Sequence, residues 1–204
     1  MSTLPVFALS PVSRTLSVDP PLTDQELEDL CFHNYVAFER RKDGLLIMNP
    51  PTGLLTGDAN AEITRQLRNW LADVPYPNYR GRVTDSSTGF FLPDGAMLSP
   101  DAAYITEEQL AGLTEDDLSH IPHLCPAFIL ELRSLSDKLP DLESKMGQWL
   151  ANGAQLGWLI DPYQQQVTVY RTGGQSVYLD VFTGTGPVAG FVLNLTNVWR
   201  CFKV

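Results

Sequence analysis

The sequence predicts a mixed α/β fold in which helices cover a β-sheet, and two observations support this class. Segments with helical and with extended patterns follow one another in the order helix, strands, helix and strand, which favours a layered sheet covered by helices. The run Leu156–Asp161 is apolar up to its last residue, as expected of a strand buried on both faces. We therefore expect a sheet with a buried central strand.

Length and composition predict a single domain preceded by an arm. The chain has 204 residues, of which 44% are hydrophobic and 19% are charged, values typical of one globular domain and unlike those of a disordered chain. Residues 1–22 are rich in Ser, Thr and Pro and are expected to be flexible. Residues 23–204 are expected to fold as one domain.

An N-terminal helix and a β-hairpin are expected as an addition ahead of the main sheet. Thr23 and Glu26 have the spacing of a capping box, which predicts a helix over residues 23–33. Residues 36–48 are predicted to form the hairpin, because their central Asp-Gly pair supplies the positive φ of a tight turn.

The remaining elements follow from periodicity and turn residues. Asp58 is expected to cap a helix over residues 58–71, whose apolar residues recur every three or four positions. An amphipathic helix is predicted over residues 141–152, and an acidic helical excursion over residues 106–119. The other strands are predicted at residues 81–84, 89–92, 101–105, 126–133, 156–161, 166–170 and 176–179, followed by a loop-rich tail.

The charge balance excludes one class of nucleic-acid and membrane binders. The 14 Lys and Arg residues against 24 Asp and Glu residues give a net charge of −10. Indiscriminate binding to nucleic acid or anionic lipid rests on an extended basic surface, and this balance excludes such a surface on the monomer. A site directed at a single phosphate is still compatible with it, because a bound metal ion inverts the local sign.

Cysteine usage and the N-terminal sequence predict a cytoplasmic protein that does not enter a membrane. The three cysteines are far apart, odd in number and without a CxxC pair, so a disulfide framework is not expected. The first residues lack a basic region followed by an apolar core, so we expect no signal peptide. The longest charge-free stretch is interrupted by Gly, Pro and Asn, which argues against a spanning helix.

Glu131 is the most informative residue, because every residue before it in the strand AFILELR is apolar. Alternation along the strand places Ile129, Glu131 and Arg133 on the same face. An ionised carboxylate that is buried without a partner is strongly unfavourable, so a partner is required. Arg133 is the nearest candidate, and a purely structural Glu–Arg ion pair is one interpretation.

Two further acids are candidates for the same site. Asp101 follows Ser99-Pro100 and begins a short strand, although Asp is a poor strand former; a turn-capping role would also explain its position. Glu39 alternates with apolar residues in the hairpin strand and is expected on the polar side, where alone it would be a solvated charge.

Lys145 completes a set of charges suited to phosphate chemistry. It falls at the margin of the apolar stripe of the helix over residues 141–152, where its stem can follow the core and present the ammonium at the end of the sheet. Gln148 lies on the same flank and is an accessory candidate. Simple snorkelling would explain Lys145 as well. Carboxylates with a lysine and an arginine together predict an oxygen site for Mg²⁺ with cations for phosphate charge.

Several segments in order carry a resemblance to a known family. They are FERRKDGLLIMNPPTG, TGDANAEITRQLRNW, DSSTGFFLPDGAMLSPDAAYI, CPAFILELRSLSDKLPDLESKMGQWLANGAQLGWLIDP and VTVYR. Over about residues 30–171 the chain resembles the Uma-two family of bacterial proteins, which are described as restriction endonucleases. That family is similar to the PD-(D/E)XK nuclease superfamily, and the resemblance implies a restriction-endonuclease-like mixed β-sheet flanked by α-helices.

The resemblance also implies a two-carboxylate metal site. Asp101 matches the PD element and Glu131 the (D/E) position, so these two are expected to hold Mg²⁺ or Mn²⁺. Glu39 would be an accessory acid. At the position of the superfamily's lysine this chain has Arg133, and Lys145 is expected to replace that lysine from the helix.

The function expected from the resemblance is metal-dependent hydrolysis of DNA phosphodiester bonds by an endonuclease. Arginine in place of the strand lysine leaves an alternative of another class, a nuclease fold retained as a binding or scaffold protein without catalysis. DNA binding is expected to be weak for the monomer because of the net charge, and we expect a homodimer.

Overall fold

The fold is mixed α/β, with two six-stranded sheets and flanking helices, which confirms the predicted class. The computed structural model describes residues 6–9, 15–34, 37–73, 81–178 and 182–203. The chain divides into two compact units. The first comprises residues 1–51, 89–99 and 114–124, and the second comprises residues 52–88, 100–113 and 125–204.

The first unit is built on an antiparallel sheet with the strand order β1-β2-β4-β3-β7-β6. Its strands are β1 Val6–Leu9, β2 Thr15–Asp19, β3 Ala37–Arg40, β4 Leu46–Asn49, β6 Phe90–Phe91 and β7 Met97–Leu98, and its helices are α1 Asp24–Asn34 and α4 Glu115–Ser119. The predicted helix and hairpin are confirmed. Thr23 and Glu26 form the expected capping box, and Gly44 has the positive φ of the hairpin turn, 84°.

Part of the segment expected as an arm is extended and paired. Thr15 and Leu16 of β2 lie opposite Ile47 and Leu46 of β4. The division of the chain into an arm of residues 1–22 and one domain of residues 23–204 stays a prediction.

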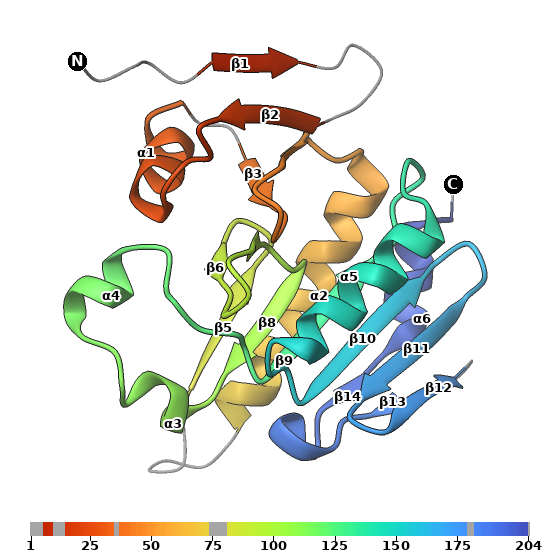
Figure 1. The fold of residues 1–204 in the computed structure, drawn as a ribbon. Coiled ribbons are helices and arrows are strands. Elements are labelled where there is room, and N and C mark those ends of the chain that lie inside the picture. The colour runs from red at the N-terminus through yellow and green to blue at the C-terminus, as the bar shows by residue number, and fades with distance from the viewer. Residues whose placement is uncertain (1–5, 10–14, 35–36, 74–80, 179–181, 204) are drawn as a thin grey trace. The chain divides into compact units, whose positions relative to one another are not determined.

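The second unit contains a mixed sheet with the strand order β12-β11-β10-β9-β8-β5, in which β9 and β10 are parallel and the other pairs are antiparallel. Its strands are β5 Arg82–Asp85, β8 Ala102–Ile105, β9 Phe128–Leu132, β10 Leu156–Asp161, β11 Gln166–Arg171 and β12 Gly174–Tyr178, with the separate pair β13 Phe182–Thr183 and β14 Val192–Leu193. The helices are α2 Leu54–Asp73, α3 Glu107–Leu110, α5 Leu139–Ala151, the 3₁₀ helix η1 Gly186–Val188 and α6 Leu195–Cys201. Helix α5 lies against one face of the sheet, and α2 and α6 lie against the other (Figure 1).

Alternate residues of β9 therefore face different helices. Three of them belong to the buried core that also contains residues of α2 and α6: Phe128, Leu130 and Leu132. Glu131 faces α5, where it accepts a hydrogen bond from Trp149. Gly157 of the neighbouring strand gives α5 its close approach, since an added Cβ would lie 2.6 Å from Met146 Cε.

Two predictions about the second unit are wrong. Helix α2 begins at Leu54, so Asp58 is inside the helix and does not cap it. The tail contains α6, where we expected loops. Helix α6 has only 7 residues, too few for a periodic pattern to stand out, and its buried residues Leu195 and Val198 contact the core of the second unit. None of the helices in the described ranges has the length and apolar character that crossing a membrane requires.

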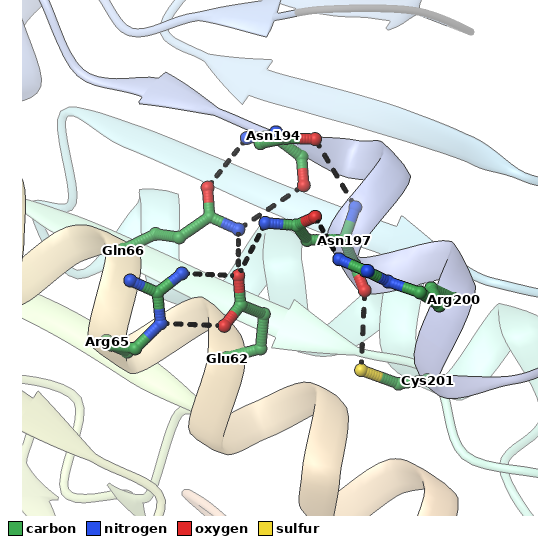
Figure 2. Close-up of polar contacts among 7 residues, drawn as sticks. All are labelled: Glu62, Arg65, Gln66, Asn194, Asn197, Arg200 and Cys201. Atoms are coloured by element: carbon green, nitrogen blue, oxygen red, sulfur yellow. Dashed lines mark hydrogen bonds and ion pairs between the residues drawn. The ribbon is translucent and has the colours of Figure 1, made fainter.

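A polar network holds α6 against α2 (Figure 2). Glu62 of α2 accepts hydrogen bonds from the side chains of Arg65, Gln66 and Asn197. The Gln66 amide also donates to the backbone oxygen of Asn194 at 3.3 Å and accepts from its backbone N–H at 2.7 Å. Asn194 is the N-cap of α6, so the network fixes the start of that helix.

We expect Glu62→Ala to lower the free energy of unfolding by about 1–3 kcal/mol at pH 7, because three side chains lose a charged acceptor. The Arg65 hydrogen bond above all lowers the pKa of Glu62. Its contribution is therefore complete above the ordinary Glu pKa and is lost as the pH falls through the lowered value. Urea denaturation at pH 7 and pH 3 tests this, with the exposed Glu143→Ala as the control. The same loss at both pH values would contradict the role of the ionised carboxylate.

Candidate active site

Glu131, near the end of β9, is buried and paired. Its residue surface is 3% exposed. The carboxylate oxygen Oε1 accepts from Lys145 Nζ at 2.9 Å and from Trp149 Nε1 at 2.9 Å. Lys145 and Trp149 are four residues apart on α5 and so share one side of that helix. Helix α5 thus supplies both the counter-charge and a neutral donor to an acid in an apolar strand.

Asp101 lies beside Glu131 because of strand pairing. In the antiparallel ladder Ala102 of β8 is opposite Leu130 of β9, which brings the residue before β8 to the end of β9. Asp101 Oδ2 accepts from the backbone N–H of Leu132 at 2.7 Å, and Oδ1 accepts from Asn60 Nδ2 at 2.8 Å. The backbone next to Glu131 and a side chain of α2 therefore orient the second carboxylate.

The two acids share the electrostatic influence of Lys145. Burial raises the pKa of Asp101, and this effect outweighs the hydrogen bond from Leu132 and the positive charge of Lys145, which both lower it. The negative charge of Asp137 raises the pKa of Asp101 further. Lys145 therefore contacts Glu131 and also acts electrostatically on Asp101.

Asn60 presents an unusual oxygen next to Asp101. Its Nδ2 donates to Asp101, whereas its buried Oδ1 has no hydrogen-bond partner among the described residues. A buried polar oxygen without a donor is uncommon in folded proteins. Asn60 lies in α2 between Ala59 and Ile63, which are both buried, so packing holds this part of the helix.

Arg133 pairs with a different acid. Its Nη1 donates to Asp161 Oδ2 at 2.7 Å, and its guanidinium carbon lies 5.5 Å from the centre of the Tyr163 ring. Asp161 ends β10, the parallel neighbour of β9, so both residues are at the same edge of the sheet. The structural Glu131–Arg133 ion pair considered above is therefore wrong, since the ion pair of Glu131 is with Lys145.

The accessory candidates differ in position. Glu39 belongs to the first unit, where it is 6% exposed and accepts from the backbone N–H of Ser99 at 2.9 Å. The expectation of a solvated Glu39 is wrong, because Ser99 provides a hydrogen-bond donor inside that unit. Gln148 is a half-buried residue of α5, three positions after Lys145.

The donor chemistry of the site fits a hard divalent cation. Asp101, Glu131 and Asn60 offer carboxylate and amide oxygens, the ligands that Mg²⁺ and Mn²⁺ prefer. Among the residues that the structure describes, no group of three His, Cys, Asp or Glu side chains is placed to hold a metal ion. A cation here would thus have two carboxylates and complete its shell with other oxygens, which is ordinary for Mg²⁺.

Sequence reasoning missed three contributors to this site. The spacing of Trp149 fits the apolar stripe of its helix, and nothing in the sequence indicates that its indole N–H reaches Glu131. Nothing in the local sequence around Asn60 or Asp161 marks either residue as part of this site. A requirement that every buried carboxylate have a donor would have prompted a search for them, although their partners are distant in sequence.

The comparisons with known proteins agree with the fold. The Uma2 family model, described as a putative restriction endonuclease, matches residues 24–195. The crystal structure of a putative nuclease belonging to DUF820 from Anabaena variabilis ATCC 29413 is similar, with a TM-score of 0.67 and 21% sequence identity over 90% of this chain and 100% of that one. A comparison with curated proteins found no match. The restriction-endonuclease-like sheet flanked by helices is thereby confirmed.

We expect the melting temperature of Asp101→Asn in EDTA to gain on that of the parent as the pH rises from 4 to 7. Because the folded pKa of Asp101 is raised, its ionised form destabilises the fold above that pKa. Below the ordinary Asp pKa the residue is protonated in both states and the cost disappears. The gain should therefore shrink between pH 7 and pH 4. Thermal melts across this range measure it, with the exposed Asp73→Asn as a control, and a gain that grows in acid would contradict the raised pKa.

Proposed function

The chain belongs to the Uma2 family, and from that membership we propose that it is a metal-dependent endonuclease that hydrolyses DNA phosphodiester bonds. The observation that carries the proposal is the arrangement at the end of β9. There the buried Glu131 binds the Lys145 ammonium at 2.9 Å. Asp101 accepts a hydrogen bond from the backbone N–H of Leu132, the residue after Glu131. Two carboxylates and a lysine ammonium, held by strands and a helix, are groups that metal-assisted phosphodiester hydrolysis uses.

Asp101 and Glu131 would hold Mg²⁺ or Mn²⁺. When bound, such a cation supplies Lewis-acid activation of a water molecule and of a phosphate oxygen. The protein's contribution is to fix the two carboxylates: the Leu132 N–H and Asn60 orient Asp101, and Trp149 orients Glu131. Both acids must be ionised to bind a cation, so we expect activity to fall as the pH drops through the raised pKa of Asp101.

Lys145 is suited to stabilising negative charge on the phosphate. Its side chain is 18% exposed, and its ammonium contacts Glu131 at 2.9 Å. A charge held in a desolvated position is effective in stabilising a transition state. Arg133 is anchored by Asp161 and stacked near Tyr163, which holds its guanidinium as a fixed donor for a phosphate oxygen.

The alternative is a nuclease fold that binds DNA or a protein without catalysis. One observation favours it: the residue two positions after Glu131 is an arginine engaged by Asp161, where the superfamily places its lysine. Arginine keeps its proton and cannot exchange it with a substrate. Under this alternative, the chain binds but does not cleave.

DNA is the proposed substrate, and the charge of the chain limits how it is bound. With a net charge of −10, the monomer should bind DNA weakly and mainly through the cation and the few positive groups of the site. A homodimer would bring two sites to one duplex, and we propose it as the active form.

We expect Mg²⁺- or Mn²⁺-dependent nicking of supercoiled plasmid DNA, stopped by EDTA. Asp101→Ala and Glu131→Ala should each lower the rate by about 100-fold or more, and Lys145→Met by a similar factor, because each removes charge complementarity at the phosphate. Glu143→Ala, an exposed change on the same helix as Lys145, should retain the parent rate.

Two results would count against the nuclease. Nicking that Asp101→Ala and Glu131→Ala leave unchanged would show that the activity arises elsewhere. No nicking by the parent, with DNA binding retained in a gel-shift assay, would support the non-catalytic alternative.

A further inference from the structure

The amide oxygen of Asn60 is a buried hydrogen-bond acceptor that the contacts described so far do not explain. This Oδ1 is buried, and no described residue donates a hydrogen bond to it. Folded proteins rarely leave a buried acceptor without a partner, and such an atom calls for an explanation. The same amide donates its N–H to the Asp101 carboxylate, so the explanation should involve the site that contains this acid.

The orientation of the amide follows from the chemistry of its partner. Asn60 Nδ2 lies 2.8 Å from Asp101 Oδ1, and an ionised carboxylate can only accept hydrogen bonds. The NH₂ group must therefore face Asp101, which leaves Oδ1 as the free end of the amide. Turning the amide over would place two oxygens against each other.

The surrounding helix holds this oxygen in place. Asn60 is in the second turn of α2, and its neighbour Ala59 and the residue Ile63 are 0% and 1% exposed. The main chain at Asn60 is thus fixed by the packing of α2, and the Asp101 hydrogen bond fixes the side chain. An oxygen held in this way is preorganised for a ligand.

A third protein oxygen would fit this site. Asp101 and Glu131 are two carboxylates, and the described residues contain no cluster of three His, Cys, Asp or Glu side chains that could hold a metal ion. Mn²⁺ and Mg²⁺ bind about six oxygens, and Asn amide oxygens are among the ligands that hard cations accept.

We propose that Asn60 Oδ1 is the third protein oxygen of the divalent-cation site, next to Asp101 and Glu131. The inference rests on the proposed function, because it assumes that the two acids bind a cation. Asn60 then has two tasks: its NH₂ orients Asp101, and its oxygen faces the cation.

The test measures binding of Mn²⁺ alone by isothermal titration calorimetry, without DNA. Asn60→Ala removes both the donor and the oxygen, and we expect it to weaken Mn²⁺ binding by about 10-fold to 100-fold. Asn60→Asp removes the donor but keeps an oxygen with added charge, so it should bind Mn²⁺ at least as tightly as the parent. Asn69→Ala, the same change at an exposed position of α2, is the control and should match the parent.

Thermal melting of the same variants gives an independent readout. In EDTA, Asn60→Asp should melt below the parent, because two carboxylates then repel each other. With Mn²⁺ its melting temperature should rise by more than that of the parent. This opposite response in the two buffers is not expected if Asn60 only supports the fold.

The outcomes separate this inference from the nuclease proposal. If the parent binds Mn²⁺ and Asn60→Ala binds it equally well, the inference is wrong and the proposed function is untouched. If both Asn60 variants weaken binding alike, only the NH₂ group matters and the inference is also wrong. If the parent does not bind Mn²⁺, metal dependence and this inference both fail. Weakened binding in Asn60→Ala with no DNA cleavage by the parent would support the cation site and contradict the nuclease.

Discussion

The second unit depends on one electrostatic requirement, that the buried carboxylate of Glu131 has a positive partner. Strand β9 is buried along its whole length, and an unpaired ionised acid there would be strongly destabilising. Lys145 meets the requirement from α5, with its Nζ 2.9 Å from the carboxylate. The position of α5 over the sheet is thus set by packing through Met146 and Trp149 and by this ion pair.

The same arrangement prepares the edge of the sheet for chemistry. Parallel strands β9 and β10 end together, so Glu131 and Asp161 come to one edge, and the antiparallel β8 brings Asp101 there as well. The acids differ in their partners: Arg133 neutralises Asp161, whereas Asp101 accepts hydrogen bonds from the neutral Asn60 amide and the Leu132 N–H. Burial raises the pKa of Asp101, and a divalent cation bound beside it would favour the ionised carboxylate.

The sequence predicted the features of this site that depend on neighbouring residues, but not the contacts between residues far apart in the chain. Glu131 and Lys145 were identifiable because a charge in an apolar strand and a lysine at the margin of a helix stripe are local anomalies. The hydrogen bond from Asn60 to Asp101 spans 41 positions and the Arg133–Asp161 pair spans 28, and no local pattern indicates either. The local sequence does not predict helix α6 either, because the stability of this short helix comes from its contacts with α2.

A thermodynamic cycle on Glu131→Gln and Lys145→Met tests whether Lys145 neutralises the buried Glu131 carboxylate. We predict that Lys145→Met alone lowers the free energy of unfolding by about 3–5 kcal/mol, because it leaves a buried charge without its counter-ion. Adding Glu131→Gln should recover most of the loss, since Gln remains an acceptor for Trp149. Urea denaturation at pH 7 measures all four proteins. If the two single effects simply add in the double variant, Lys145 does not neutralise Glu131 and the ion pair does not stabilise the second unit.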